Sequence, residues 1–528
     1  MKKIIITILI LILVAAGVYF GFFFHCNQNY EVDENSPPDE VSEIVPVFGG
    51  EIRLAQTPIT LWCPLSAQSE SHIQVFNLIF DSLVTVEANM TPIPNLATAW
   101  SVSEDARTWT VYLNRNARWH DGEPFTAYDV QFTVNAIRSR RHNSIYYQNI
   151  QNISRVDVVD DYTVKFTLFQ PRSNFVNTLY FPIIKFQAGQ FNPQTYVPLG
   201  TGAFIFAPPE HDNLILEKNP NWHGEEIYVD HINVSIVPAN QNLFMFSAQQ
   251  IDMLISHDIN WGRNVSTAIV RYTNIPTNRF TFLGLNHSNQ LLRELHIREA
   301  IAHSINYRGL VQNVLHHRAT PAFSPISPTW ALHDSSSLPP EFNPELARQI
   351  LLANDWEQGE DGIFVRRVGW QTQRLQFDIL INNDNPLREQ VAIFIQNSLR
   401  EVGIAVNIVS VTFYQYSSRL GWGGFDMFIG EYKILSDLDF DFILGRNNSF
   451  RLRDNELEEL LTNTRLQTNA SDTMHAYNAL QAYIYETIPL IGLYYKNATL
   501  LYNPQINGSP TPTFHNIYRG INNLWVNN

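Results

Sequence analysis

The sequence predicts an α/β protein with several domains, and three observations lead to this prediction. The chain has 528 residues, which at roughly 150 residues a domain indicates about two to four domains. Residues 375–411 have the pattern strand, helix, strand with short connections, which is typical of a βαβ unit with parallel strands. Residues 108–168 place short alternating strands around one helix, which indicates a separate α+β lobe.

The composition is that of a folded globular protein and argues against several classes. Hydrophobic residues are 45% and charged residues 16% of the chain, so a largely disordered protein is excluded. The net charge of −15 argues against a nucleic-acid partner, because neutralising phosphates requires clustered Lys and Arg. Cys26 and Cys63 are too few for a disulfide scaffold or a cysteine-rich zinc module. Aromatic residues, at 12%, favour a ligand-binding cleft.

Residues 1–26 are predicted to be an N-terminal signal or membrane anchor. Lys2 and Lys3 precede an apolar run from Ile4 to Phe24 that is long enough, as a helix, to cross a bilayer. Bulky residues before Cys26 fit a signal-peptidase site and a lipoprotein box equally poorly. An uncleaved anchor is therefore the favoured interpretation, and a lipid anchor on Cys26 stays open. The basic N-terminal flank places the bulk of the chain outside the cytoplasm.

Residues 27–47 are predicted to be an acidic tether rich in Pro and Ser. They contain no basic residue, so the segment repels itself and cannot bury a core. The folded part is expected to begin near Gly49 with a strand over 51–55, which Thr57-Pro58 ends.

The next elements follow from local patterns in residues 108–168. A strand is expected over 108–113, and a helix is expected to begin after Thr126. Thr126 and Asp129 have the spacing of a capping box, in which each side chain bonds the other residue's amide. Residues 156–159 and 164–168 are expected to form a hairpin about Asp160-Asp161.

The βαβ unit has clear boundaries in the sequence. A strand is expected over 375–381, and Asn385 followed by Pro386 is a helix N-cap with proline at the first helical position. Gly403 has the place of a left-handed C-cap, and 404–411 returns as an apolar strand. Asn343-Pro344 begins another predicted helix.

Several segments, taken together, resemble one known family. They are Pro94-Asn95-Leu96-Ala97 with Trp100, Ser103-Glu104-Asp105, the continuous run 113–130 with Trp119-His120-Asp121-Gly122 at its centre, 200–204, 298–305, 343–347 and Phe425-Asp426. In this order they resemble bacterial extracellular solute-binding proteins of family 5, the oligopeptide-, dipeptide- and nickel-binding components of ABC importers. Asn306-Tyr307 and Ala203 depart from the family pattern, but neither bears on the fold. His120 and Asp121 are interpreted as structural residues of a turn.

The resemblance implies a type II periplasmic-binding-protein-like fold, a two-lobe clamshell with an additional inserted α+β lobe, preceded by the N-terminal membrane segment. Lobe I is expected to be discontinuous, over 48–76, 200–278 and 495–528, with lobe II over 77–199 and lobe III over 279–494. The implied function is capture of a peptide or a similar small solute by hinge closure and its delivery to a membrane permease. We expect a monomer without cofactors. A tethered peptide sensor that does not import is the alternative.

An enzyme is not expected. The sequence contains none of the motifs of elbow hydrolases, HExxH zinc peptidases or P-loop enzymes, and a glycosidase is only a distant alternative. Asp437, Asp439 and Asp441 resemble the start of a calcium loop, but Phe442 and Asn448 stand where Gly and Glu are needed. No metal site is therefore predicted, and neither is one at His316-His317.

Six residues are predicted to contact the ligand. Peptide-binding relatives place an acidic residue three positions after an aromatic, where it receives the peptide ammonium. Tyr432 matches the aromatic, but Leu435 stands at the acidic position, so Asp437, or Asp439, is expected to take that part by a shift of the loop. Trp62, Trp330 and Tyr432 are candidate apolar walls. A ligand without a free amino group, stacked on Trp422 and Tyr432, is the alternative.

Overall fold

The computed structural model describes residues 46–526, except 68, 141–142, 189–190, 208–212, 264 and 266–269. Residues from Val47 to Asn528 form one compact unit. In the described ranges, no helix is long and apolar enough to cross a membrane. The predicted anchor over 1–26 and all but the end of the predicted tether over 27–47 lie outside the described residues.

The first sheet joins strands that are far apart in sequence. Its order is β1 (Glu51–Gln56), β10 (His231–Ile236), β9 (Asn213–Lys218) and β8 (Phe204–Phe206). β1 lies parallel to β10, and its alternate residues Ile52 and Leu54 are fully buried. Helix α2 (Glu70–Ile79) follows β1, and Ser69 caps it by accepting the His72 amide. The sheet thus draws on two of the three segments proposed for lobe I.

A second sheet lies within residues 97–168 and has the order β4 (Ala97–Val102), β5 (Thr108–Leu113), β7 (Thr163–Leu168) and β6 (Ile153–Asp160). The predicted hairpin is confirmed, since β6 and β7 pair antiparallel. Helix α3 (Ala127–Arg140) begins one residue after Thr126, as expected. The predicted capping box forms only in half: Asp129 accepts the Thr126 amide, but the Thr126 hydroxyl donates to the same carboxylate. Asp129 also accepts from Trp119 and from the Phe186 amide, and these contacts turn its carboxylate inward.

The third sheet is the largest and has the order β11 (Met253–Ser256), β20 (Leu490–Tyr502), β12 (Arg271–Leu285), β19 (Met427–Lys433), β17 (Gln376–Asn382) and β18 (Ala405–Val411), with β13 (Ala319–Pro321) beside β20. The predicted βαβ unit is confirmed, because β17 and β18 are parallel and α9 (Pro386–Val402) connects them. Asn385 accepts the Arg388 amide, and Gly403 has a φ of 102°, so both predicted caps are confirmed.

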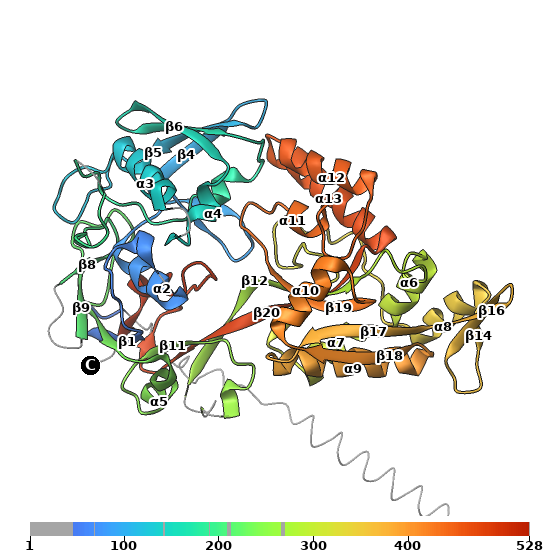
Figure 1. Ribbon diagram of the computed structural model, residues 1–528. Helices are drawn as coiled ribbons and strands as arrows, with labels where there is room; N and C mark the ends of the chain where they lie inside the picture. Colours follow the sequence, from blue (N-terminus) through green and yellow to red (C-terminus); the bar gives the residue numbers. More distant parts are fainter. Residues whose placement is uncertain are drawn as a thin grey trace, which may run out of the picture. The chain divides into compact units, whose positions relative to one another are not determined.

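Strands β12 and β20 connect the hydrophobic cores. They pair antiparallel over most of their length, and the pairing is irregular between Pro276 and Phe280. Ile275 at one end of β12 packs in the core of the first two sheets, whereas Leu283 at the other end packs in the core around the βαβ unit. In Figure 1 the two strands run between β11 and β19. They are therefore the physical link between the two halves of the folded unit.

Arg298 connects helix α6 (Leu295–Ser304) to the C-terminal end of helix α13 (Ala470–Thr487) by hydrogen bonds. It lies in α6, is 7% exposed and has no carboxylate partner among the described residues. Its guanidinium donates instead to four backbone carbonyl groups. Two of these carbonyls belong to Thr487, the last residue of α13, and to Ile488, which follows it. Arg298 thus satisfies carbonyls that the end of α13 leaves without helical partners.

The remaining elements complete the described chain. They are the helices α4 (Tyr147–Ile150), α5 (Asn242–Ser247), α7 (Tyr307–Asn313), α8 (Pro344–Ala353), α10 (Phe413–Trp422), α11 (Asp441–Leu444) and α12 (Asn455–Leu466), and the strands β2 (Val84–Val86), β3 (Pro92–Pro94), β14 (Glu357–Gln358), β15 (Phe364–Val368), β16 (Gln371–Arg374), β21 (Ile506–Asn507) and β22 (Trp525–Val526), besides short 3-10 turns. The helix predicted at Asn343-Pro344 is confirmed as α8, with the Asn343 side chain accepting the Leu346 amide.

Candidate functional site

Three adjoining cavities form a cleft next to the connecting strands. Their volumes are about 390, 290 and 40 Å³. Asn149 lines all three, Asp437 lines the first and the smallest, and Tyr180 and Lys433 line the second and the smallest. We call these three cavities together the central cleft. Because they share lining residues, one ligand can occupy more than one of them.

The central cleft is built from parts of the chain that meet only in the folded protein. One wall comes from the start of α2 and from residues 145–180, which include α4. The other comes from Arg279 on β12 and from the segment 433–437 that leaves β19. Two hydrogen bonds join the sides beyond the cavities: the Ser173 hydroxyl donates to the Thr464 carbonyl at 2.6 Å, and Asn174 donates to the Tyr477 hydroxyl at 3.0 Å.

Asp437 lies where the two walls approach each other and faces an arginine from the opposite side. Its Oδ2 is 3.4 Å from Nε of Arg172, and the same guanidinium contacts the carboxylate of Asp439. Arg465 also binds Asp439, with 2.8 Å between Nη2 and Oδ1, and reaches Asp441 at 3.2 Å. Two guanidinium groups therefore balance most of the charge of three carboxylates.

The pKa of the Asp437 carboxyl is raised to about 6, chiefly by burial and also by the nearby Asp439, while Arg172 acts in the opposite direction. The desolvation of this carboxylate outweighs the attraction of one imperfectly placed guanidinium. Near neutral pH, Asp437 is thus an incompletely compensated anion in the cleft, which a second cation can stabilise.

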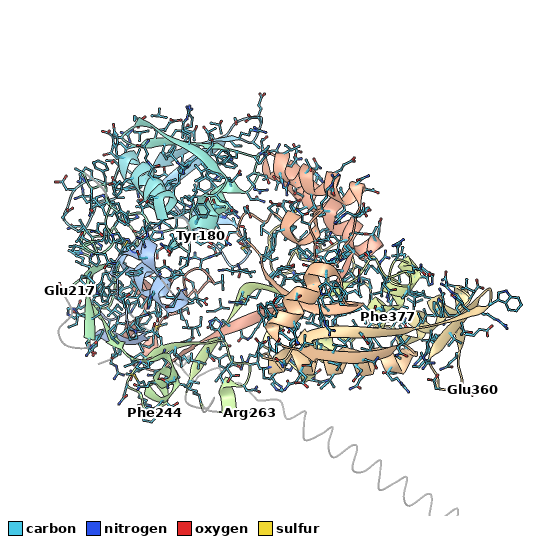
Figure 2. The ribbon with its side chains drawn as sticks, in the orientation of Figure 1. Tyr180, Glu217, Phe244, Arg263, Glu360 and Phe377 are labelled. Carbon is cyan, nitrogen blue, oxygen red and sulfur yellow. The ribbon has the colours of Figure 1, made fainter. Side chains whose placement is uncertain are left out.

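Aromatic and amide side chains form the rest of the cleft around Tyr180, which Figure 2 labels. The Tyr180 ring lies 4.2 Å from the His515 ring, between centroids. His515 Nε2 is 3.1 Å from the Ser436 hydroxyl, and burial lowers the pKa of the imidazole to about 3, so His515 is neutral. Asn149 donates to the Thr178 carbonyl at 2.7 Å, which leaves its carboxamide oxygen for other partners. The cleft therefore combines flat apolar faces with fixed polar groups.

The structure brings three of the six predicted ligand residues to or near this site. Asp437 lines two of the cavities. Asp439 lies beside it but is held by Arg172 and Arg465. Tyr432 stacks on the Phe282 ring, and its hydroxyl is 2.9 Å from the Ser449 hydroxyl. Tyr432 lines none of the three cavities, so it supports the wall from behind.

The three predicted tryptophans lie elsewhere. Trp62 packs against Phe206, with ring centroids 5.0 Å apart, at the edge of the first core. Trp330 is buried and packs against Tyr495 at 5.1 Å. Trp422 ends α10 and is 67% exposed. None of the three lines the central cleft as the structure has it.

In the described part of the chain, no group of three or more His, Cys, Asp or Glu side chains is arranged to hold a metal ion. The three alternating aspartates 437, 439 and 441 face Arg172 and Arg465 instead. Cys63 is a free, buried thiol.

With this geometry in place, the comparison with known families is decisive. The model of the bacterial extracellular solute-binding proteins, family 5 Middle, matches residues 91–444, which is more than half of the chain. The chain belongs to this family. It is therefore a solute-binding protein, and the resemblance noted in the sequence is confirmed.

Individual relatives of this family 5 protein are distant but cover most of it. It is 24% identical to the probable D,D-dipeptide-binding periplasmic protein DdpA of Escherichia coli, over 78% of this chain and 81% of that protein. It is also 24% identical to the nickel-binding periplasmic protein of Escherichia coli, over 80% of this chain and 83% of the relative. Among solved structures, it is similar to the oligopeptide-binding protein AppA of Bacillus subtilis in complex with a nonapeptide, with a TM-score of 0.62, 20% identity and coverage of 92% and 100%. This structural likeness shows a shared fold.

The family's signature residues stabilise the scaffold in this protein. The His120 amide donates to the Gly200 carbonyl, and the Gly200 amide donates to His120 Nδ1 at 3.3 Å. The ring proton therefore lies on Nε2, which is 3.1 Å from the Gly202 carbonyl. Burial lowers the pKa of His120, which keeps this neutral form. Asp121 pairs with Lys185. These contacts agree with the structural role expected of both residues.

Sequence reasoning missed most of the residues that line the cleft. Arg172, Tyr180, Lys433 and His515 belong to no motif and are separated by up to several hundred positions. Lys433 is the one with a signal in the sequence, because it follows the aromatic Tyr432 directly and opens the segment that leads to Asp437.

Proposed function

We propose that this protein is the extracytoplasmic binding component of an ABC importer that captures a peptide in the central cleft and delivers it to a membrane permease. The observation that carries the proposal is the cleft itself: Asn149 lines all three of its cavities, and Tyr180, Lys433 and Asp437 each line two of them. A relative named as a probable D,D-dipeptide-binding protein and a structural relative that holds a nonapeptide support the peptide class.

The connecting strands suit a closing motion. Two cores connected by β12 and β20 can rotate when a few residues change their backbone angles, and the irregular pairing between Pro276 and Phe280 supplies such a place. Closure would remove the ligand from water and strengthen its polar contacts. We infer that the lobe boundaries given above, 77–199 for lobe II and 279–494 for lobe III, delimit the moving parts. Binding needs no second copy of the chain, so we propose a monomer.

The apolar run over 4–24 supports a position at the outer face of the membrane. We propose that it retains the protein there, as a helix or through a lipid on Cys26, and that residues 27–47 act as the tether. In this position, the protein would present its ligand to the permease without leaving the membrane. Protease treatment of intact cells should release a fragment that begins within 27–47, and replacing Cys26 by Ser should detach only a lipid-anchored form.

We propose that the peptide's ammonium binds beside Asp437, whose carboxylate is desolvated and only partly balanced by Arg172. An ammonium entering there would either displace the guanidinium or share the carboxylate with it. The Asp437→Asn variant should bind free-amine peptides more than tenfold more weakly, about 1.4 kcal/mol, and N-acetylated ones almost unchanged. Equal losses for both kinds of peptide would assign Asp437 a structural role.

The function itself is tested by identifying the natural ligand. Mass spectrometry of the molecules that co-purify with the full-length chain should find short peptides. The recovered compound should raise the melting temperature by linkage and reduce the radius of gyration in solution scattering. Co-purification of a sugar that the protein hydrolyses would refute the proposal, as would a true ligand that binds without any compaction.

A further inference from the structure

Two cations lie directly opposite each other on the strands that form the floor of the central cleft. Arg279 on β12 and Lys433 on β19 are partners in the antiparallel register, so their side chains leave the same face of the sheet. Both line the 290 Å³ cavity. Like charges in directly opposite positions destabilise a strand pair, so this arrangement calls for negative charge close to both cations.

The two cations differ in how they are paired. Arg279 Nη1 is 3.1 Å from Glu431, which lies two positions before Lys433 on β19. Lys433 has no carboxylate within ion-pair distance among the described residues, and its ammonium nitrogen lies 5.5 Å from the centre of the Phe514 ring, a cation–π contact. Of the two cations of the floor, Lys433 is thus the one without an ion pair.

The surroundings of Lys433 are those of a binding position rather than of open surface. Although the Lys433 side chain is exposed to solvent, partial desolvation lowers the pKa of its ammonium. The charge of Glu70 raises this pKa, and that of Arg279 lowers it again. His515, which also lines the cavity, is neutral and adds no further positive charge. Glu70 also lines the cavity and attracts the Lys433 ammonium, but the two side chains form no ion pair in the described part of the chain, and the Glu70 carboxylate lies 3.8 Å from His257 Nε2.

We propose that the solute carries a carboxylate and that Lys433, assisted by Arg279, binds it at the floor of the central cleft. This inference rests on the proposed function, since it names the chemistry of the ligand that occupies the same cleft. Lys433 and Asp437 both line the 40 Å³ cavity. A zwitterionic solute can therefore place its negative group at Lys433 and its positive group toward Asp437.

In a peptide, the carboxylate has two possible sources, the C-terminus and an acidic side chain. The probes are a tripeptide pool with free C-termini, the same pool amidated, and an amidated pool with Glu at one position. Citrate serves as a carboxylate without a peptide. Binding to the ligand-stripped full-length chain is followed by calorimetry and by melting temperature.

The variants test separately whether binding needs a positive charge and whether that charge must be at position 433. Lys433→Gln removes the charge, and Lys433→Arg keeps it. Lys496→Gln is the matched control, because Lys496 on β20 is another lysine whose pKa burial lowers and which interacts electrostatically with Arg279, yet it lines none of the three cavities.

The wild type should bind the free-acid pool at least tenfold more tightly than the amidated pool, and Lys433→Gln should abolish this difference. Lys433→Arg should restore most of it, and Lys496→Gln should retain it. If the amidated Glu pool binds as tightly as the free acids, and depends on Lys433, the side chain is the source. If free-acid and amidated pools bind equally, with and without Lys433, the inference is overturned while the proposed function stands.

If no pool binds, the peptide class of the proposed function fails, and citrate then decides the inference. Citrate binding that Lys433→Gln abolishes would support the carboxylate position, and no such binding would overturn it. The melting temperature without ligand gives an independent reading. Lys433→Gln should leave it unchanged or raise it, because the opposition to Arg279 is relieved. A lower value, matched by Glu70→Gln, would show that Lys433 serves a structural ion pair and would overturn the inference.

Discussion

The carboxyl of Asp437 should make the protein less stable as the pH rises through the mildly acidic range. Burial raises its pKa from 3.8 in the unfolded chain to about 6 in the folded one. The folded state therefore holds a proton that the unfolded state releases, and stability falls between about pH 4 and pH 6. The shift of about two units corresponds to an upper limit of roughly 3 kcal/mol.

Asp437→Asn removes this titration while keeping the shape of the side chain. We expect the variant to gain stability relative to the wild type between pH 4 and pH 7, by up to roughly 3 kcal/mol. Urea unfolding of ligand-stripped protein at half-unit pH steps measures the difference directly. The variant should also show a flatter dependence on pH over this range.

Asp361→Asn is the control, because the pKa of Asp361 is shifted in the opposite direction from that of Asp437. The hydrogen bond from Arg374 lowers the pKa of Asp361 to about 2, so its stabilisation is present above pH 4 and is lost only in stronger acid. Asp361→Asn should therefore lose stability relative to the wild type as the pH rises from 2 to 4. If Asp437→Asn behaved in the same way, Arg172 would dominate the carboxyl and the desolvation argument would be refuted.

Two further predictions concern the scaffold. Arg298→Met should lower the free energy of unfolding by roughly 3–5 kcal/mol in urea titrations, because four backbone carbonyls, in two buried and two partly buried hydrogen bonds, lose a charged donor; a loss below about 1 kcal/mol would contradict this. Gly200→Ala should destabilise strongly, because a Cβ at Gly200 would lie 1.8 Å from the Ile79 carbonyl oxygen, whereas Gly421→Ala meets nothing within 4 Å. Equal melting temperatures for the two glycine variants would refute the steric argument.

The sequence by itself determined the local elements and the family. Asn385, Pro386 and Gly403 delimit α9 because caps are formed by residues next to the helix they end, so no distant contact is needed. The hairpin of β6 and β7 and the parallel pair of β17 and β18 followed in the same way from short-range patterns. The family could be predicted because its signature, around Trp119 to Val130, is continuous in the chain.

Only the tertiary structure decided which side chains meet in the cleft. Arg172 faces Asp437 from 265 positions away, and nothing in either local sequence specifies that approach. The burial that raises the pKa of Asp437 likewise depends on both walls of the cleft. The three tryptophans, in contrast, were predicted to contact the ligand, but the structure places them outside the cleft. Their size suggested a binding wall, but Trp62 and Trp330 pack in cores and Trp422 faces solvent, because large apolar residues serve a core and a cleft equally well.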